Sequence, residues 1–446
     1  MFRFALDELK KWSIRKDRKP LLIRGARQVG KSYLVREFAK QHNLTLFELN
    51  FEKSSEIATI FQSQDPKEIL RLLAIYFKRP IPLENSILFL DEIQQNPHVL
   101  QSFRFFYEDV PQLRLISAGS LLDFALSEAE FSMPVGRIEY FFLGPMQFDE
   151  FLLAMEEKQI FDFIKNFSFG NAIPDFIHHK LNNLLCTYLI VGGMPEAIQT
   201  YISYGEFTSV ERVKSNLLMT YQDDFRKYRR RVPYERLVRL FDTIPKLVGN
   251  KFKYAHVDPH ELAKNLSQAL DLLCMARITY RVYRSASNSP PLRAEINKKF
   301  FKLLFLDVGL MVHSSGLNLF EIKQASNLNL VNKGAVAEQF VGQQLLYSLP
   351  FYLEPELHYW GREKPTASSE VDYVIAEVGH IVPIEVKSGA GGKLKSLDVF
   401  SLEKKHPCAI RFNSELPTTF KLPSGCKVFS LPLYLVGETR RLIRAF

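Results

Sequence analysis

A glycine-rich segment near the amino terminus has the residue types that bind phosphate groups. Residues 25–32 have the sequence GARQVGKS, which fits the spacing GxxxxGK[ST], and they lie between an apolar stretch, PLLIR, and an amphipathic one, SYLVREFAKQ. The two glycines allow the backbone to curl so that its N–H groups face phosphates, and a helix beginning here adds the positive end of its dipole. The predicted nucleotide-binding residues of this segment are Gly25, Ala26, Arg27, Gln28, Val29, Gly30, Lys31 and Ser32. Lys31 would reach the β- and γ-phosphates, and Ser32 would bind Mg²⁺.

Two adjacent acids follow an apolar stretch about sixty residues further on. In SILFLDE, residues 86–92, a predicted buried strand ends at Asp91 and Glu92. Asp91 is predicted to bind Mg²⁺ through water, and Glu92 to orient or polarise the attacking water. Because a second acid follows the first, the pair favours hydrolysis of nucleotide over binding alone.

Two further residues are candidates for the same chemistry. The next predicted core strand, LRLISAGSLL, contains Ser117 and Ser120, either of which would sense the γ-phosphate; a serine that caps the following helix is the alternative. Arg137, in PVGRIEYFFLGP, is a candidate arginine finger acting in cis or from a neighbouring subunit, and its alternative is a surface ion pair.

A third group of charged residues lies near the carboxyl terminus. Residues 368–389 predict a hairpin, with Asp372 in its first strand and Glu385 and Lys387 on one face of its second strand. A carboxylate followed by carboxylate-x-lysine is the arrangement of a metal-dependent nuclease, in which the acids hold Mg²⁺ and the lysine stabilises the charged phosphate. Glu338, on a predicted preceding helix, is a candidate third ligand. An exposed hairpin with ordinary alternating charges is the alternative.

The net charge of +9 is confined to the middle of the chain. Residues 221–300 contain 17 Lys and Arg against 8 Asp and Glu, so the rest of the chain has 41 of each. A localised basic excess predicts a polyanionic partner, with DNA the leading candidate, bound without sequence specificity. The expected phosphate contacts are the run FRKYRRR, residues 225–231, together with the residues around a turn-rich loop, SASNSPP: Arg277, Arg281, Arg284, Arg293, Lys298 and Lys299. A solvated basic surface on a helical domain is the alternative.

Length and composition indicate the class of protein that carries these motifs. A chain of 446 residues with 46% hydrophobic and 24% charged residues predicts about three globular domains rather than disorder. No apolar run reaches the length of a membrane helix, the amino terminus lacks the apolar region of a signal peptide, and the four cysteines form no CxxC pair, which together predict a cytoplasmic protein. In the first 145 residues, apolar stretches alternate with amphipathic ones, the pattern of a parallel α/β sheet.

Taken together, the motifs resemble a widespread family of bacterial and archaeal AAA-superfamily ATPases. The matching stretches include GARQVGKS, ILFLDE, SAGS, LGPMQFDEFL, VGGMPEAI, FLDVGL, GAVAEQF and IVPIEVKSG, and they cover nearly the whole chain. In such proteins a carboxyl-terminal domain of unknown function is related to the PD-(D/E)XK nucleases. The resemblance implies ATP-site roles for Lys31, Ser32, Asp91 and Glu92, and it matches Asp372, Glu385 and Lys387 to the nuclease-type motif.

The expected fold is α/β in four parts. These are a P-loop AAA-type core (1–145), a helical lid (146–220), a winged-helix-like basic connector (221–295) and a restriction-endonuclease-like α/β domain (296–446). The expected function is Mg²⁺-dependent ATP binding and hydrolysis coupled to action on DNA, with a possible homo-oligomer and a nuclease-like domain of undecided activity. The alternative is a nucleotide-dependent switch or scaffold that binds a protein partner through an inactive nuclease-like domain.

Overall fold

The computed structural model describes residues 1–120, 122–128, 133–228, 231–316, 334–364, 367–387 and 394–445. The chain forms two compact units. The N-terminal unit contains residues 1–144, 275–277 and 350–354, and the C-terminal unit contains residues 145–274, 278–349 and 355–446. The units divide between Gly144 and Pro145, and the first expected domain boundary, after residue 145, stays a prediction.

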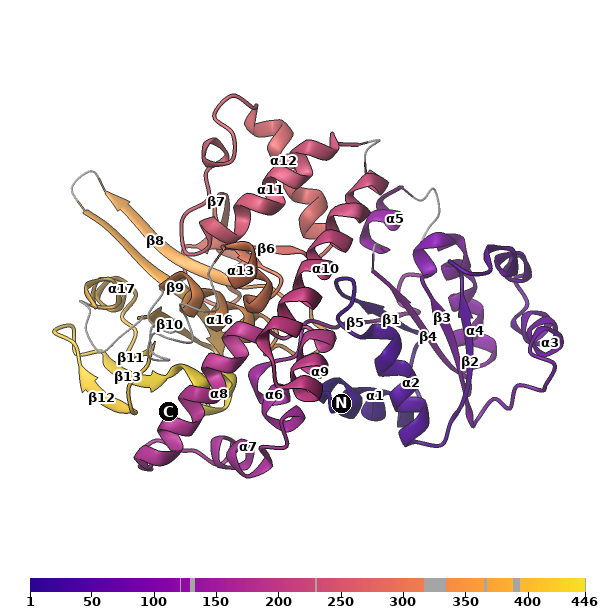
Figure 1. The fold of residues 1–446 in the computed structure, drawn as a ribbon, viewed down its shortest axis with the longest axis horizontal. Helices are drawn as coiled ribbons and strands as arrows, with labels where there is room; N and C mark the ends of the chain where they lie inside the picture. The colour runs from indigo at the N-terminus through magenta and orange to yellow at the C-terminus, as the bar shows by residue number, and fades with distance from the viewer. Residues whose placement is uncertain are drawn as a thin grey trace. The chain divides into compact units, whose positions relative to one another are not determined.

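The N-terminal unit is built on a parallel sheet of five strands, which confirms the α/β prediction (Figure 1). The strand order is β2-β3-β4-β1-β5, and every neighbouring pair is parallel. The strands are β1 (Leu21–Arg24), β2 (Thr45–Asn50), β3 (Ser86–Asp91), β4 (Arg114–Gly119) and β5 (Glu139–Phe142). All six residues of β3 are buried, as expected of a central strand covered on both faces.

The helices of this unit follow the amphipathic stretches. They are α1 (Phe4–Ile14), α2 (Lys31–Gln41), α3 (Pro66–Tyr76), α4 (Phe103–Asp109) and α5 (Leu122–Glu128), with 3₁₀ turns η1 (Ser55–Gln62), η2 (Ile93–Gln95) and η3 (Pro97–Ser102). Helix α3 begins at a proline, and the side chain of Asp65 accepts a hydrogen bond from the Lys67 backbone N–H. Leucine and phenylalanine side chains of α3, α4 and η1 form one apolar cluster with those of the sheet, and this cluster fixes the strand ends that carry the polar motifs.

The C-terminal unit begins with helices and ends with a mixed sheet. Its helices are α6 (Phe148–Ala154), α7 (Lys158–Lys165), α8 (Asp175–Val191), α9 (Pro195–Tyr204), α10 (Phe207–Phe225), α11 (Tyr234–Leu247), α12 (Ala263–Met275), α13 (Val308–Ser314), α16 (Gly334–Leu346), α17 (Lys395–Lys404) and α18 (Thr439–Ile443). Two sequence motifs meet inside the unit. The buried carboxylate of Asp307, from FLDVGL, accepts hydrogen bonds from the backbone N–H groups of Leu310 and of Gly193, in VGGMPEAI.

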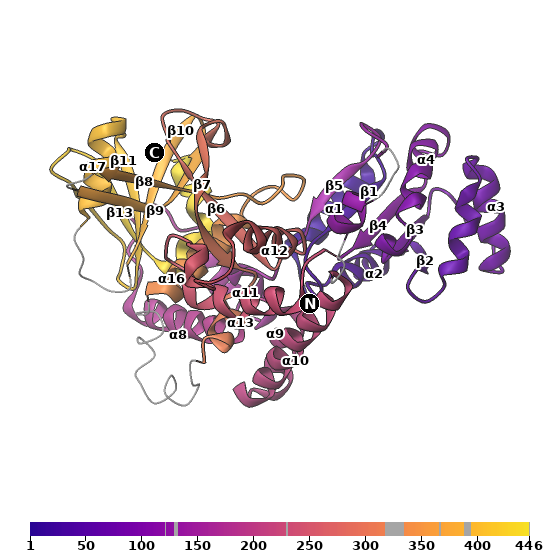
Figure 2. The same ribbon diagram turned by 90° about the horizontal axis from the view of Figure 1, so that it is seen from above.

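Eight strands form the sheet of this unit, in the order β12-β13-β11-β10-β9-β8-β6-β7. They are β6 (Thr279–Ser285), β7 (Ile296–Phe305), β8 (His358–Lys364), β9 (Ala367–Glu377), β10 (His380–Val386), β11 (Cys408–Asn413), β12 (Thr418–Lys421) and β13 (Lys427–Pro432). The predicted hairpin of residues 368–389 is present as antiparallel β9 and β10. Helix α16 packs on β7 and β10, and α17 packs on β9 and β10 (Figure 2).

The sequence predicted a separate connector at residues 221–295, but part of this segment belongs to the eight-stranded sheet. The turn-rich loop does join two antiparallel strands, β6 and β7, but β6 also pairs with β8, so both strands belong to the sheet of the C-terminal segment. The expected boundary between residues 295 and 296 falls inside this hairpin. Because alternation along one strand does not identify its partners, the sequence did not reveal which sheet the hairpin joins.

Among the described helices, none combines the length and the apolar character needed to cross a membrane.

Candidate functional sites

The glycine-rich loop joins β1 to α2, as its sequence predicts. Gly30 has φ 94°, a left-handed conformation that favours glycine. A Cβ on Gly25 would lie 2.1 Å from the carbonyl oxygen of Leu143, the residue that follows β5. This segment therefore lies too close to Gly25 for a larger residue at that position. The side chain of Arg3 is buried and donates to the carbonyl oxygens of Val29, at 3.0 Å, and Gly144, at 2.8 Å. Arg3 thus fixes the loop from outside the motif.

Lys31 folds back over this loop. Its Nζ donates to the carbonyl oxygens of Gly25, at 3.1 Å, and Ala26, at 2.8 Å, and its side chain is buried. Burial lowers the pKa of Lys31 to about 8, although the charges of Glu92 and Asp91 oppose the shift. Among the described residues, the ammonium therefore has only neutral hydrogen-bond partners, a cost that an anion would relieve.

The two predicted Mg²⁺ ligands are in direct contact. The hydroxyl of Ser32 donates to Oδ2 of Asp91 at 2.8 Å, across the gap between α2 and the end of β3. Asn50, which is paired with Asp91 in the β2–β3 register, adds a weaker contact of 3.4 Å to the same oxygen. Burial raises the pKa of Asp91, opposed by the hydrogen bond from Ser32. A hydroxyl beside a buried carboxylate is a donor set that suits a hard divalent cation.

Glu92 follows in a strained backbone conformation. Its φ is 53° and its ψ is 42°, a left-handed geometry that costs on the order of 1–3 kcal/mol in a residue other than glycine. The amide of Gln94 donates to Oε2 of Glu92, and the other amide atom of Gln94, the buried Oε1, lies beside Gly119. This geometry turns the Glu92 side chain away from the line of β3 and holds it there through Gln94. Sequence reasoning missed Gln94, since a single glutamine after an acidic pair is not distinctive.

The two candidate serines have different surroundings. Ser117 lies in the middle of β4 and donates to the carbonyl oxygen of Leu21 at 3.4 Å. Ser120 lies just beyond the end of β4, and its buried hydroxyl has no hydrogen-bond partner among the described residues. A buried hydroxyl left unpaired at the carboxyl edge of the sheet fits a group that bonds to a ligand, so the geometry favours Ser120 over Ser117.

Arg137 does not reach the loop within its own unit. Its Nε donates to Oε1 of Glu108, at 3.2 Å, and its side chain is substantially exposed. This contact corresponds to the surface ion pair considered as the alternative. A role as an arginine finger stays a prediction, and it would require a second subunit to receive the side chain.

A buried arginine from a distant part of the chain also enters the N-terminal unit. Arg277 pairs with Asp123 of α5, at 3.0 Å, and with Glu354, at 2.9 Å, while Arg24 binds the other oxygen of Asp123 at 2.7 Å. Arg277 was expected to contact DNA phosphates. This expectation is wrong in the structure, because ion pairs hold the buried guanidinium inside the unit.

The predicted carboxyl-terminal acids do come together. The β9–β10 register pairs Tyr373 with Ile384, so the next opposing pair along the ladder is Asp372 and Glu385. Oδ2 of Asp372 accepts a hydrogen bond of 2.8 Å from the Val386 backbone N–H, and Lys387 pairs with Oε1 of Glu385 at 2.5 Å. Burial, and then the charge of Asp372, raise the pKa of Glu385.

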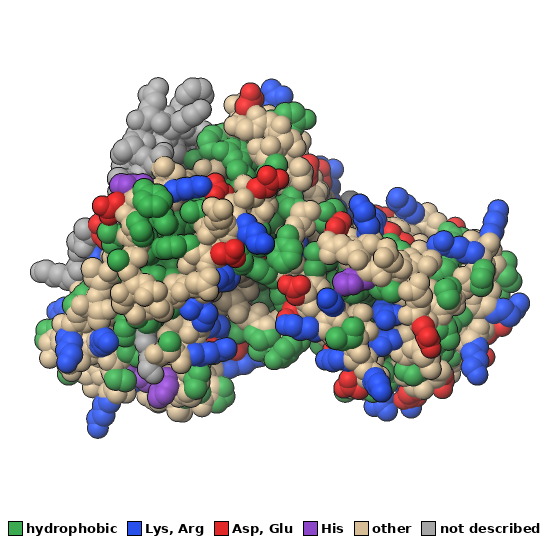
Figure 3. All heavy atoms as spheres, turned by 90° about the horizontal axis from the view of Figure 1, so that it is seen from below, with side chains coloured by type: hydrophobic (Ala, Val, Ile, Leu, Met, Phe, Trp, Pro, Cys, Tyr) green, Lys and Arg blue, Asp and Glu red, His purple; other side chains and the backbone are tan. Residues whose placement is uncertain are grey.

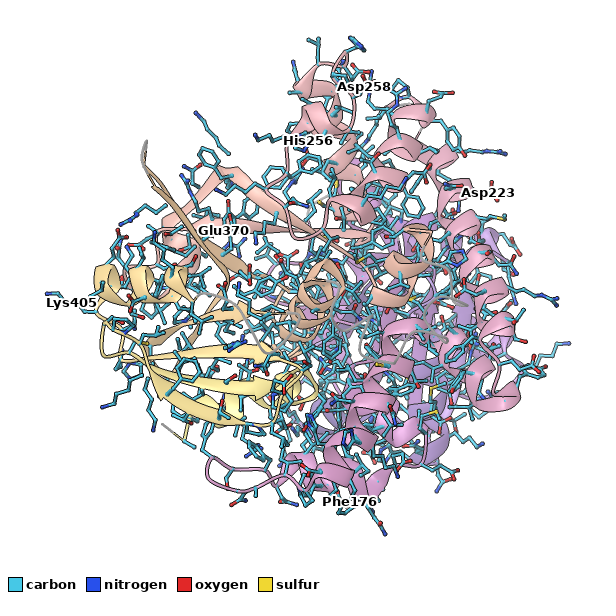
Figure 4. All side chains as sticks on the ribbon, turned by 60° about the vertical axis from the view of Figure 1, so that its left-hand side comes forward. Phe176, Asp223, His256, Asp258, Glu370 and Lys405 are labelled. Carbon is cyan, nitrogen blue, oxygen red and sulfur yellow. The ribbon has the colours of Figure 1, made fainter. Side chains whose placement is uncertain are left out.

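A lysine outside the predicted motif lies among these acids. Lys302 of β7 is 2% exposed, and its Nζ lies 2.8 Å from Oε1 of Glu338, 2.6 Å from Oε1 of Glu370 and 3.5 Å from Oδ1 of Asp372. Glu370, labelled in Figure 4, also pairs with Lys251 at 3.4 Å. Burial alone would lower the pKa of Lys302, but the three carboxylates outweigh it and place this pKa well above its usual value.

We call this group the acid–lysine cluster; its members are Lys251, Lys302, Glu338, Glu370, Asp372, Glu385 and Lys387. Sequence reasoning found four of them and missed Lys251, Lys302 and Glu370. Their strands carry many charges, and only the pairing of β7 with the rest of the sheet and the packing of α16 bring these side chains together. Within the described residues, no three acids, histidines or cysteines are arranged to hold a metal ion.

The basic segment is partly neutralised within the C-terminal unit. Arg281 is mostly buried and pairs with Asp271 at 2.6 Å, so its predicted contact with phosphate is also wrong. Lys298 and Lys299 are exposed on β7, whereas Arg229 and Arg230 lie outside the described residues. On the face drawn in Figure 3, lysines and arginines lie scattered among acids rather than in one continuous field.

Comparison with family models supports the prediction of an AAA-type domain at the amino terminus. Residues 17–152 match a family model described as an AAA domain. Residues 182–321 and 333–434 match two models described as domains of unknown function, DUF8612 and DUF4143. The N-terminal unit thus combines a five-stranded parallel sheet and a glycine-rich loop with a match to an AAA domain model. A search of curated proteins found no significant match.

Solved structures resemble the chain only distantly. The Walker-type ATPase of Pyrococcus abyssi is 16% identical, with a TM-score of 0.44, and the match covers 70% of this chain and 95% of that one. The ORC2 protein of Aeropyrum pernix, in ADPNP–ADP complexes, is 11% identical, with a TM-score of 0.35 over 73% of this chain and 95% of its own. C. elegans PCH-2 is 11% identical, with a TM-score of 0.29 over 48% and 67%. At these values the likenesses define neither the substrate nor the partners of the present chain.

Proposed function

We propose that the protein is a Mg²⁺-dependent ATPase that uses nucleotide turnover to act on DNA. The observation that carries the ATPase part is the 2.8 Å contact between the Ser32 hydroxyl and the Asp91 carboxylate, beside a lysine whose hydrogen-bond partners in the described part of the chain are all neutral. The loop N–H groups and Lys31 would bind the phosphates, and Ser32 and Asp91 would hold Mg²⁺. The ion would neutralise charge on the β- and γ-phosphates.

Glu92 is the proposed base of the reaction. Its carboxylate would accept a proton from the attacking water, and its release from Gln94 would precede that step. Ser120 would donate its unpaired hydroxyl to the γ-phosphate and so report which nucleotide is bound.

The test uses two variants of the purified protein and one control. Lys31→Ala should abolish nucleotide binding, whereas Glu92→Gln should bind ATP normally and hydrolyse it at least about 10²-fold more slowly. Lys40→Ala, on the exposed face of α2, should behave as the wild type. Normal turnover by Glu92→Gln would refute the assignment of the base.

The proposed DNA partner rests on the basic excess of residues 221–300 and on its exposed members, among them Arg231, Lys298 and Lys299. Replacing Arg229, Arg230 and Arg231 with alanine should reduce the slope of log K against log salt by up to about 2 to 3 units, at about 0.9 per lost duplex contact. The control replaces Lys10, Lys11 and Lys16, which are exposed in the N-terminal unit. An unchanged slope in the first variant would place the polyanion site elsewhere.

A second candidate is a nucleotide-dependent switch that binds a protein partner. The internal ion pairs of Arg277 and Arg281 favour it, because they remove two cations from the expected DNA surface. Measurement of ATPase rate with and without single-stranded and duplex DNA separates the candidates. Strong stimulation supports action on DNA, and its absence supports the switch.

A further inference from the structure

The resemblance to metal-dependent nucleases implies a divalent cation at Asp372 and Glu385, and the acid–lysine cluster allows this implication to be tested residue by residue. Each carboxylate that the motif would offer has a partner already. Oδ1 of Asp372 faces Lys302 at 3.5 Å and Oδ2 accepts from the Val386 N–H at 2.8 Å. Oε1 of Glu385 pairs with Lys387 at 2.5 Å, which leaves Oε2 of Glu385 as the one motif oxygen without a partner among the described residues.

The candidate third ligand, Glu338, also pairs with Lys302. Oε1 of Glu338 lies 2.8 Å from Nζ of Lys302, so the lysine takes up one of its two carboxylate oxygens. A Mg²⁺ ion needs near-octahedral oxygen ligands at about 2.0–2.1 Å, and carboxylates that each already pair with a lysine do not supply them. The residues present therefore do not fit a bound divalent cation.

Lysines offset most of the negative charge of the cluster and leave one carboxylate in excess. The four carboxylates of Glu338, Glu370, Asp372 and Glu385 face three ammonium groups, those of Lys251, Lys302 and Lys387. Lys302, which is 2% exposed, forms ion pairs with three of the four acids. The metal ion of a nuclease site must exchange with solvent and be exposed to the substrate. The positive charge of this cluster is instead the ammonium group of Lys302, which is part of β7 and cannot exchange.

We infer that the Lys302 ammonium takes the place of a catalytic metal, so that the nuclease-like sheet is a metal-independent module that does not cleave DNA. The cluster then serves to join β7, α16 and the β9–β10 hairpin, which lie far apart in sequence. Such a module holds its fold in the same way with or without divalent cations.

The first experiment measures thermal unfolding without nucleotide, in EDTA and in Mn²⁺. The wild type should unfold at the same temperature in both. Lys302→Met, which keeps the length of the side chain but removes the charge, should unfold at a temperature lower by on the order of 5–15 °C in EDTA, because it leaves buried acids unpaired. Mn²⁺ should recover part of this loss, and the double variant Lys302→Met with Asp372→Asn should recover less. Lys298→Met, on the exposed part of the same strand, is the matched control.

A second measurement decides the question if Lys302→Met does not fold. Mn²⁺ binding to the wild type and to Asp372→Asn is followed by electron paramagnetic resonance without nucleotide. Equal binding by the two proteins supports the inference. A Mn²⁺ site that Asp372→Asn removes, Mn²⁺-dependent nicking of supercoiled DNA that Glu385→Gln removes, or a Lys302→Met variant as stable as the wild type would overturn it. ATPase activity is recorded on the same samples, so failure of the proposed ATPase function is visible separately.

Discussion

Two buried lysines, one in each unit, lie near carboxylates, yet their surroundings are opposite. Within the residues that the structure describes, Lys31 donates only to the carbonyl oxygens of Gly25 and Ala26, while the nearby Asp91 accepts from a hydroxyl. Lys302 bonds directly to three carboxylates. The pKa of Lys31 is lowered to about 8 by burial, and that of Lys302 lies well above its usual value.

This difference separates a site prepared for a ligand from a cluster that stabilises the fold. A charged side chain that bonds only to neutral groups can bind an incoming ion without first breaking an internal ion pair. The full electrostatic attraction then contributes to the binding of an anion and its cation. When the charges are paired with one another, a ligand has little left to neutralise. Similar residue types therefore support different roles, and the pairing distinguishes them.

Matched substitutions at the two lysines give the largest expected contrast. In nucleotide-free protein at neutral pH, Lys302→Met should lower the free energy of unfolding by about 3–5 kcal/mol, since it leaves buried acids without their cation. Lys31→Met should not lower it, because burial disfavours the charged form of Lys31 in the folded state. Chemical denaturation of both variants measures the contrast. Equal destabilisation would remove the proposed distinction between the two lysines.

The pH dependence of nucleotide binding sharpens the comparison. Since only protonated Lys31 attracts phosphate, ADP affinity should be nearly constant below about pH 8 and fall by up to about tenfold per pH unit above it. The affinity falls with rising pH because the lowered pKa makes Lys31 of the nucleotide-free protein lose its proton above about pH 8. Binding of ADP must then return this proton, which costs free energy. Titration of a fluorescent ADP analogue across this range measures the effect, with Lys31→Arg expected to give a flat profile. A flat profile in the wild type would contradict the role of Lys31.

The smallest expected effect is at Ser120. Ser120→Ala should reduce ATP turnover by about 3- to 10-fold, the value of one hydrogen bond to the γ-phosphate, without weakening ADP binding or the fold. Ser117→Ala is the control, since it removes a bond to the Leu21 carbonyl and should affect stability rather than turnover. Steady-state kinetics and thermal unfolding separate the two. Loss of ADP affinity in Ser120→Ala would indicate a general packing role.

Several features of the nucleotide site are contained in short stretches of sequence. The order of β1, the glycine-rich loop and α2 follows from local apolar pattern and from Gly25 and Gly30, so it was predictable. The positions of Asp91 and Glu92 at a strand end were predictable for the same reason. What the sequence did not reveal was Arg3 holding the loop and Gln94 holding Glu92, because both contacts depend on how distant segments pack.

The C-terminal unit shows where local pattern stops being informative. The sequence by itself determined that Asp372, Glu385 and Lys387 lie on a hairpin, since alternation and a glycine turn specify one. Only the tertiary structure decided that Lys302, seventy residues before Asp372, lies among these acids, and that Arg277 and Arg281 are buried in ion pairs. The physical reason is that the sequence around a charged residue does not show which residue will pair with it. The order of the strands and the packing of the helices fix the partner, and both depend on the whole chain.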